Sequence, residues 1–310
     1  MFRTLVVPLD GSDLAEQAIP YAVKLAQNGR GGLILARAAL GPPPVRLDGA
    51  DWEQEQSDAV EAAERYLADV AGTLDSDVQV STQVGYGHAA SQIISIAADS
   101  GADAIVMATH GRTGLAHLLY GSVAEAILAD SHVPVFLVRA QAGEARQSPF
   151  EPKTARLLVP LDGSPFAEAA LQTAVDFLDA TGELVLLRVA EEPDHVERDQ
   201  NGRVLAYLDQ QEEARTREAR DYLVQVARKV ADQHPQIRMR LDVRIGGPVT
   251  GIGVAALANQ SDLIVMATRG RTGVRRAIVG SVAGAVLCAG HTPVLLVHPQ
   301  VQSSVPIGAP

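Results

Sequence analysis

Residues 4–13 read TLVVPLDGSD, and residues 156–165 read RLLVPLDGSP. The shared core VPLDGS recurs 152 positions further along the chain. In each copy, a short run of Val and Leu ends at an Asp-Gly-Ser turn, and apolar residues at helical spacing follow the turn. A strand, a tight turn and a helix in this order begin a βαβ unit, so this stretch predicts a parallel sheet that starts twice in one chain.

A second block of the sequence repeats at a longer interval. Residues 103–114 read DAIVMATHGRTG and residues 262–273 read DLIVMATRGRTG, 159 positions apart. Both blocks continue to Gly-Ser-Val-Ala, at residues 121–124 and 280–283. Because the interval grows from 152 to 159 positions, the second copy carries a net insertion of seven residues.

The length of one repeat defines the predicted domains. One copy has about 150 residues, which is the size of a whole domain rather than of a solenoid unit. The stretch between the copies is polar and holds two prolines, as expected of a linker. We therefore expect tandem domains at residues 1–140 and 154–299, a linker at 141–153 and a flexible tail at 300–310.

The composition indicates a folded, acidic protein. Of the 310 residues, 47% are hydrophobic and 20% are charged, which argues against intrinsic disorder. The net charge of −11 argues against nucleic acid as a partner. The single cysteine, Cys288, excludes a disulfide framework, and no apolar run is long enough for a transmembrane helix. The N-terminus lacks the features of a secretory signal, so we expect a cytoplasmic protein with no membrane partner.

Strands and helices are expected to alternate within each copy. In the first copy, the hydrophobic patterns predict strands at 5–9, 33–36, 78–84, 104–107 and 133–138, and helices from residue 12 onward and at 52–71, 88–99 and 122–130. Ser12 or Asp13 is expected to cap the first helix, and Pro20 predicts a kink or a late start. The longest helix of the second copy is expected at 207–232. This alternation predicts a mostly parallel sheet with helices on both faces.

Two segments of each copy follow the carboxyl ends of strands, where open parallel sheets bind ligands. One is the turn at Asp10, and the other is the long turn that ends at Gly121 and Ser122. The helix that starts there would attract a phosphate through its free N–H groups, and the Asp10 carboxylate could accept hydrogen bonds from a nucleoside. These residues predict a nucleotide pocket. In the alternative interpretation, the glycines only shape a turn, and Ser122 and Asp10 only cap helices.

The pairing of VPLDGS with ATHGRTG and then GSVA resembles the universal stress protein family, and the resemblance covers nearly all of both halves. It implies an α/β fold of two tandem Rossmann-like domains, similar to adenine-nucleotide α-hydrolases. Each domain would have a five-stranded parallel sheet in the order 3-2-1-4-5, with helices on both faces. The resemblance also implies that the protein binds ATP, alone or with Mg²⁺.

The ATP-binding members of that family carry the signature G-x2-G-x9-G-(S/T). The second part of this signature is matched by Gly111 with Gly121-Ser122, and by Gly270 with Gly280-Ser281. The first glycine is replaced by Ala108 in one half and by Ala267 in the other. If this position needs a positive φ, alanine costs on the order of 1 kcal/mol, whereas at an extended position the replacement is nearly silent.

Carried over by position, the resemblance implies a nucleotide contact for each matched residue. In the first half these are Pro8 and Asp10 at the adenosine, Ala38 at the adenine through its backbone, Met107 and Ala108 at the ribose, and Gly111, Gly121, Ser122 and Val123 at the phosphates. The second-half set is Pro160, Asp162, Val189, Met266, Ala267, Gly270, Gly280, Ser281 and Val282.

Several other kinds of site are not indicated. The Walker pattern and a G-x-G-x-x-G after the first strand are absent from the sequence. The counterpart of His110 is Arg269, and no nucleophile and base recur in both halves, so we predict no catalytic residue and no metal site. We expect a stress or signalling regulator that binds ATP with little or no hydrolysis. A slow ATPase and a nucleotide-free scaffold of the same fold remain as alternatives.

The terminal apolar strands, at 133–138 and 292–297, would expose edges if they were left unpaired. The family resemblance implies that such strands pair between domains. We therefore expect the two halves to form an intrachain pseudo-dimer, and we also consider that two chains associate as a homodimer.

Overall fold

Strands and helices alternate through both repeats, as the sequence predicts. The computed structural model describes residues 2–39, 52–74, 77–110, 121–140, 151, 154–178, 181–193, 197–198, 204–268 and 279–298. The first half contains β1 (Thr4–Pro8), α1 (Asp13–Glu16), α2 (Ile19–Gly29), β2 (Gly32–Ala39), α3 (Trp52–Gly72), β3 (Gln79–Tyr86), α4 (Ala89–Asp99), β4 (Ala104–His110), α5 (Ser122–Asp130) and β5 (Val135–Ala140).

The second half repeats this order, and its described residues also include a short antiparallel strand pair. Its elements are β6 (Arg156–Pro160), α6 (Pro165–Phe177), β7 (Glu183–Ala190), β8 (Glu197–Arg198), β9 (Val204–Ala206), α7 (Leu208–Gln233), β10 (Arg238–Ile245), α8 (Pro248–Ala258), β11 (Leu263–Ala267), α9 (Ser281–Ala289) and β12 (Val294–Val297). The insertion inferred from the repeat spacing falls between β7 and β10. This part of the second half contains the antiparallel pair β8–β9 and α7, which has 26 residues where α3 has 21.

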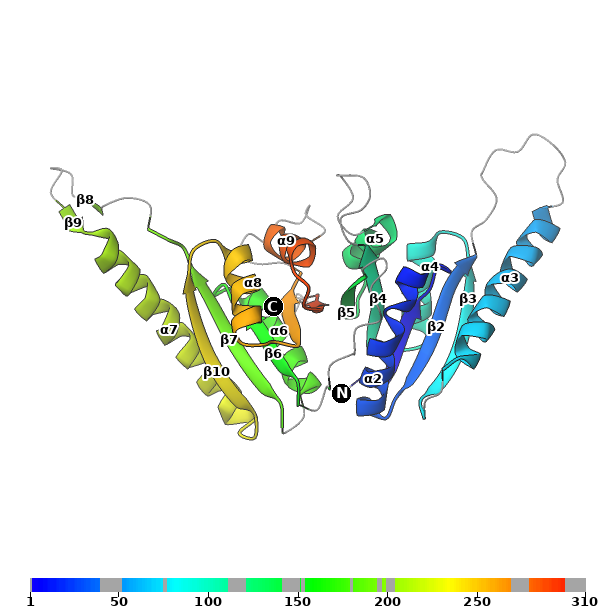
Figure 1. The fold of residues 1–310 in the computed structure, drawn as a ribbon, viewed down its shortest axis with the longest axis horizontal. Coiled ribbons are helices and arrows are strands. Elements are labelled where there is room, and N and C mark those ends of the chain that lie inside the picture. The colour runs from blue at the N-terminus through cyan, green and yellow to red at the C-terminus, as the bar shows by residue number, and fades with distance from the viewer. Residues whose placement is uncertain are drawn as a thin grey trace, which may run out of the picture.

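Ten of the described strands form one continuous sheet, in the order β10-β7-β6-β11-β12-β5-β4-β1-β2-β3 (Figure 1). Within each half, all neighbouring strands are parallel. Numbered along the chain within its own half, each set of five strands has the order 3-2-1-4-5. The strand order reverses beside β1 and beside β6, and open parallel sheets bind ligands at the carboxyl ends of the strands beside such a reversal.

The two halves join through their last strands, β5 and β12, which pair antiparallel at the centre of the sheet. Leu137 lies opposite Val294, and Phe136 lies opposite Leu295. These four side chains are buried, with at most 2% of their surface exposed. The terminal strands therefore pair within one chain, as expected from their apolar sequences, and neither exposes an edge.

Helices cover both faces of the sheet. One core layer, under α1, α2, α3, α6 and α7, contains buried residues of both halves, and so does the layer on the other face, under α4, α5, α8 and α9. Each layer runs across the β5–β12 junction. The helices on both faces explain why the strands read as nearly continuous apolar runs.

The segment after β1 shows how a local signal divides a helix. Ser12 caps α1, which ends at Glu16, and α2 begins at Ile19. Pro20 occupies the first turn of α2, where its missing N–H would have no partner within the helix. The late helix start that Pro20 predicted is therefore confirmed.

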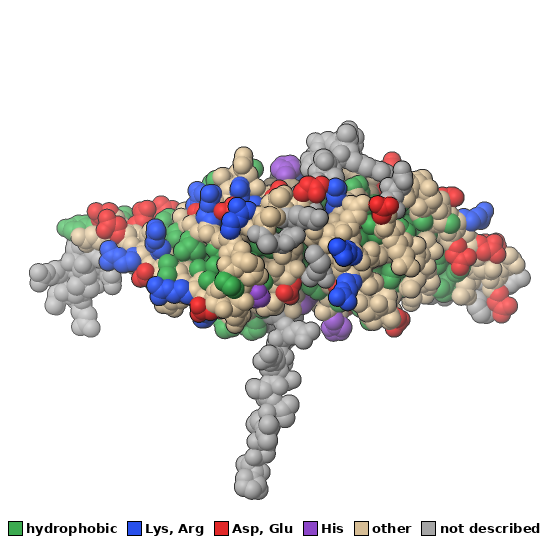
Figure 2. Space-filling model, turned by 90° about the horizontal axis from the view of Figure 1, so that it is seen from below, with side chains coloured by type: hydrophobic (Ala, Val, Ile, Leu, Met, Phe, Trp, Pro, Cys, Tyr) green, Lys and Arg blue, Asp and Glu red, His purple; other side chains and the backbone are tan. Residues whose placement is uncertain are grey.

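Charge is distributed unevenly between the halves. Residues 1–150 hold 9 basic and 18 acidic side chains, and residues 151–310 hold 17 and 19. Seen from below, Asp and Glu side chains lie at both ends of the molecule, including the outer end of the first half, where α3 lies (Figure 2). No helix in the described part of the chain is long and apolar enough to cross a membrane.

Candidate functional site

The turn that follows β1 holds its aspartate in one orientation. Oδ1 of Asp10 accepts hydrogen bonds from the backbone N–H of Ser12, at 2.9 Å, and from the Ser12 hydroxyl, at 2.6 Å. The oxygen of that hydroxyl accepts a hydrogen bond from the N–H of Ala15, at 3.2 Å, so Ser12 is the N-cap of α1. Gly11 has a φ of +92°, which favours glycine. The exposed carboxylate of Asp10 is thereby fixed beyond the carboxyl end of β1.

The second half builds the same turn after β6. Oδ1 of Asp162 accepts hydrogen bonds from the N–H of Ser164, at 2.9 Å, and from its hydroxyl, at 2.6 Å. Ser164 caps α6 by accepting from the N–H of Ala167, at 3.1 Å, and Gly163 has a φ of +84°. In both halves the serine caps the helix, and the aspartate holds the serine in place.

The second strand of each half extends past the end of the first. The pairing of β2 with β1 ends near Ala36, whose C=O accepts a hydrogen bond from the N–H of Leu9 at 2.8 Å. Because backbone groups two residues apart point to the same side of a strand, the N–H and C=O of Ala38 face the space above the end of β1. In the second half, the pairing of β7 with β6 ends at Leu187, and Val189 holds the place of Ala38.

Ala108 and Ala267, which replace the first signature glycine, are both extended. Ala108 lies in β4 opposite Val138, and Ala267 ends β11 opposite Val297. Neither alanine has a positive φ. Alanine is fully allowed in the extended region, so these replacements bring no backbone strain.

The helix that follows the fourth strand begins at a glycine in each half. Gly121 is the N-cap of α5 and Gly280 is the N-cap of α9, and neither helix start has a side-chain cap. Gly121 has a φ of +86°, whereas Gly280 has a φ of −57°. The N–H of Gly280 donates to the C=O of Thr268, at 2.7 Å, which holds the start of α9 at the carboxyl end of β11. In Figure 1, α5 and α9 both lie toward the top of the view, one in each half.

The other predicted contact residues differ in exposure. Pro8 and the side chains of Met107 and Met266 are buried. Ser122 and Ser281 are exposed at the helix starts. The remaining described members are half-buried, namely Ala38, Val123, Pro160, Val189 and Val282.

Part of the predicted site lies outside the described residues. Gly111 and Gly270 belong to the segments 111–120 and 269–278, together with Arg112, Arg269 and Arg271.

A group of charged and aromatic side chains beside the Asp10 turn was not predicted from the sequence. The guanidinium carbon of Arg37, near the end of β2, lies 4.4 Å from the ring centroid of Tyr66 in α3. The hydroxyl of Tyr66 donates to Oε1 of Glu16 in α1, at 2.9 Å. The guanidinium also lies against Gly11, since a Cβ built there would be 2.9 Å from Nη1 of Arg37.

The second half contains the same group. The guanidinium carbon of Arg188 lies 5.6 Å from the ring centroid of Tyr222, whose hydroxyl donates to Glu168 at 3.0 Å. Nη1 of Arg188 donates to the C=O of Leu161, at 3.1 Å, just before Asp162. Both tyrosines are held in their neutral form. Burial, followed by the hydrogen bond and charge of the neighbouring glutamate, raises the pKa of each above its ordinary value.

The sequence holds a signal for this group that only a full comparison of the repeats reveals. Glu16 and Glu168 lie at the same distance after the Asp-Gly-Ser turn. Tyr66 begins YLADVA and Tyr222 begins YLVQVA. The arginine-to-tyrosine interval changes from 29 to 34 residues, so a constant offset between repeats does not align them.

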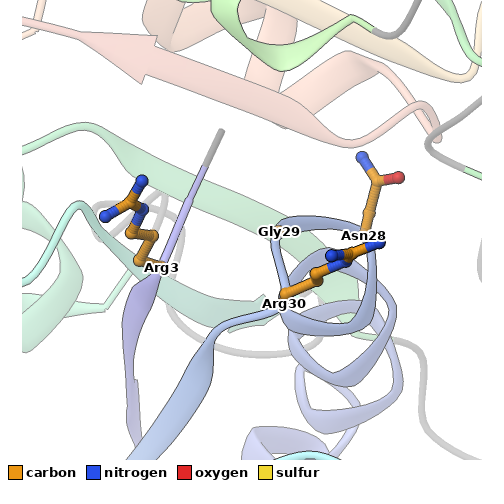
Figure 3. Close-up of a pocket in the computed structure, with 4 residues that line it drawn as sticks. All are labelled: Arg3, Asn28, Gly29 and Arg30. Atoms are coloured by element: carbon orange, nitrogen blue, oxygen red, sulfur yellow. The ribbon is translucent and has the colours of Figure 1, made fainter.

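A pocket of about 690 Å³ lies at the other end of the strands and is lined by Arg3, Asn28, Gly29 and Arg30 (Figure 3). Arg3 precedes β1, and the other three residues end or follow α2. The pocket is therefore separate from the candidate site. Among the described residues, no group of three or more His, Cys, Asp or Glu side chains is placed to hold a metal ion.

Comparison with known proteins agrees with the fold and with the repeat. The family model described as the universal stress protein family matches residues 1–139 and again residues 153–298. A universal stress protein of Mycobacterium tuberculosis is 26% identical over 306 residues, which cover 94% of this chain and 96% of that protein.

A second relative matches about half of the chain, and a solved structure matches nearly all of it. A universal stress protein of Methanocaldococcus jannaschii is 30% identical over 141 residues, 45% of this chain and 83% of that protein. The crystal structure of a universal stress protein from Archaeoglobus fulgidus matches 95% of this chain and 98% of its own, with a TM-score of 0.69 and 21% identity. At that identity the structural match shows the shared fold alone.

Proposed function

The chain belongs to the universal stress protein family, and on that premise we propose that each half binds one adenine nucleotide, ATP, at the carboxyl edge of its sheet. Binding would change the conformation or the partner choice of the protein, which acts as a stress or signalling regulator with little or no hydrolysis.

The observation that carries this proposal is the same pair of features at the carboxyl edge of both halves. A carboxylate, Asp10 or Asp162, is fixed there by two hydrogen bonds. An uncapped helix begins on the same edge, at Gly121 or Gly280. A nucleotide needs acceptors at its base and ribose and donors at its phosphates, and the carboxylate and the helix N-terminus supply both.

The proposed contacts follow from this arrangement. The carboxylate would accept from the nucleoside, and the backbone of Ala38 or Val189 faces the space where an adenine edge could bind. The phosphates would meet the first N–H groups of α5 or α9, beside the exposed hydroxyl of Ser122 or Ser281. Ala108 and Ala267 stand where the family signature has glycine, and both are extended, so they introduce no backbone strain at this site.

Slow hydrolysis is the second part of the proposal. Phosphoryl transfer requires metal ligands and a base that positions the nucleophile. No such set recurs in the two repeats of the sequence, because His110 of the first copy corresponds to Arg269 of the second. Any Mg²⁺ would therefore arrive with the phosphates of the nucleotide.

Mass spectrometry of the nucleotide released from freshly purified, denatured protein tests the proposal. We expect two ATP per chain, and about one after either Asp10→Ala or Asp162→Ala. One ATP in the unaltered protein would mean that the halves have diverged. If no nucleotide is released and titration with ATP produces no heat and no thermal shift, the nucleotide-free scaffold replaces this proposal.

The proposal also places the protein in the cytoplasm as a homodimer of such two-domain chains. Light scattering at several protein concentrations measures the association. A strictly monomeric particle at all of them would remove the homodimer and leave the two nucleotide sites unaffected.

A further inference from the structure

Each half connects its longest helix, α3 or α7, to the turn that carries the aspartate through the same three side chains. In the first half these are Glu16, Tyr66 and Arg37, and in the second they are Glu168, Tyr222 and Arg188. The glutamate accepts from the tyrosine hydroxyl, and the tyrosine ring lies beside the guanidinium. A planar cation beside an aromatic ring is attracted electrostatically by the ring face. The ring therefore limits where the arginine can go.

The far side of each arginine meets the turn that carries the aspartate. Nη1, Nη2 and Cζ of Arg37 all lie within 3.3 Å of the place that a Cβ on Gly11 would take. Arg188 stands slightly further from Gly163, at 3.6 Å by the same measure, and donates to the C=O of Leu161. In both halves the arginine thus lies between the long helix, α3 or α7, and the turn.

We propose that Arg37 and Arg188 are positioning residues, which hold the Asp-Gly turn of each half in the form that receives the nucleoside end of the ligand. This inference rests on the proposed function. The turn contains a glycine with positive φ, which loses much freedom on ordering. The guanidinium and the tyrosine ring that pack against the turn would lower the entropy cost of ordering it on binding, because the aspartate is already in place.

Arginine suits this role better than lysine would. Its planar guanidinium can lie along the tyrosine ring and donate in the plane to a carbonyl, as Arg188 does to Leu161. An ammonium on a flexible stem would keep the charge and lose the fit.

Nucleotide affinity in a one-site background tests the role of Arg37. Asp162→Ala is introduced to disable the second site, and adenosine, AMP and ATP are titrated by calorimetry. We expect Arg37→Ala to weaken all three ligands by the same factor, about five- to tenfold, since only the nucleoside end is affected. Arg37→Lys should recover part of the loss. Arg65→Ala, which removes an exposed arginine of the same helix as Tyr66, is the matched control and should change nothing.

Two results of this titration would overturn the inference. Equal affinities for Arg37→Ala and Arg65→Ala would show that the arginine does not prepare the turn. A loss that grows from adenosine to AMP to ATP would show that Arg37 contacts the phosphates instead. If the protein without substitutions binds none of the three ligands, the proposed function fails, and the inference is then decided by a second measurement that needs no ligand.

The second measurement compares the stability of two glycine variants and tests whether the side chain of Arg37 is held in place. A Cβ at Gly11 would meet Nη1 of Arg37 at 2.9 Å, and a Cβ at Gly163 would meet Arg188 at an ordinary 3.6 Å, while both positions carry the same positive-φ strain. If Tyr66 holds Arg37, Gly11→Ala should lower the folding equilibrium constant about fivefold more than Gly163→Ala. Arg37→Ala should remove the difference. Equal effects of the two glycine substitutions would mean that Arg37 swings away freely, and the positioning role would be wrong.

Discussion

The two glycines that begin α5 and α9 show how much a single dihedral angle can differ between repeats. Gly121 has a φ of +86°, and Gly280 has a φ of −57°. Both precede Ser-Val-Ala, and both cap a helix of nine residues. The four residues Gly-Ser-Val-Ala are identical in the two repeats, whereas the six residues before them, LAHLLY and VRRAIV, differ, so the shared motif by itself does not set the dihedral angle.

This difference leads to a prediction about stability. Gly121→Ala should lower the free energy of unfolding by about 1 kcal/mol, because alanine is disfavoured at positive φ. A Cβ at Gly121 would meet no atom within 4 Å, so the loss would come from the backbone alone. Gly280→Ala, the matched control, should change the free energy by a few tenths of a kcal/mol. Urea unfolding curves measure both variants, and equal losses would contradict the assigned dihedral angles.

At the scale of the element, the hydrogen bonds from Tyr66 to Glu16 and from Tyr222 to Glu168 tie α3 to α1 and α7 to α6. Each tie depends on a neutral tyrosine. Burial and the adjacent glutamate raise the tyrosine pKa above its ordinary 10.0, so folding favours the protonated hydroxyl. The stability that this contributes is fully present below pH 10 and is lost as the pH rises toward the folded-state pKa.

We therefore expect the free energy of unfolding to fall above pH 10, by at most about 1.4 kcal/mol per pH unit from each of these tyrosines. Tyr66→Phe removes one titrating hydroxyl, so its unfolding free energy should fall less steeply over the same range. Glu16→Gln keeps an acceptor without the charge and should give an intermediate slope. Urea unfolding between pH 9 and about 11.5 measures the slopes. Identical slopes for the unaltered protein and Tyr66→Phe would contradict the predicted shift.

In helix α8, the hydrophobic periodicity of the sequence does not predict which face is buried. Its sequence, PVTGIGVAALA, is apolar on every side, so the hydrophobic pattern does not define a buried face. The structure buries Ile252 and leaves Leu257 78% exposed. In the corresponding helix α4, the exposed positions include Ser91, Ser95 and Asp99, and there the pattern does separate the two faces. Tertiary packing against the sheet decided the orientation of α8.

At the scale of the whole molecule, the β5–β12 junction makes one sheet and two continuous core layers out of two repeats. Phe136 lies at this junction opposite Leu295, has no exposed surface, and has its ring 6.1 Å from that of Tyr21. The ring of Phe2 in the first half lies 5.8 Å from the ring of Phe177 in the second. The halves are therefore expected to unfold together.

Phe136→Ala tests this cooperativity. Removing a fully buried phenylalanine should cost about 3–5 kcal/mol, through lost burial and the cavity left behind. Because the residue packs at the junction, hydrogen exchange should increase in peptides of both halves by the same free energy. Ala98→Gly, at an exposed position of α4, is a control for a local change and should affect its own helix alone. Faster exchange confined to residues 2–140 would show that the halves unfold separately.

The sequence by itself was sufficient for the fold class, the duplication, the parallel sheet and the late helix start at Pro20. These depend on local chemistry, since strand periodicity, Asp-Gly-Ser turns and proline act on neighbouring residues. It also predicted which residues follow the carboxyl ends of the strands. Whether Ala108 and Ala267 strain the backbone could not be read from it, because φ at those positions depends on pairing with β5 and β12.

Tertiary structure alone decided the contacts between residues far apart in the chain. It placed Arg37 and Tyr66 side by side across 29 residues, and Arg188 and Tyr222 across 34. Because of the insertion in the second repeat, the two arginine–tyrosine pairs do not align in the sequence. In the structure the two pairs occupy equivalent positions. Periodicity reports which face of an element is apolar, but only the packing of a helix on a strand determines which side chains meet.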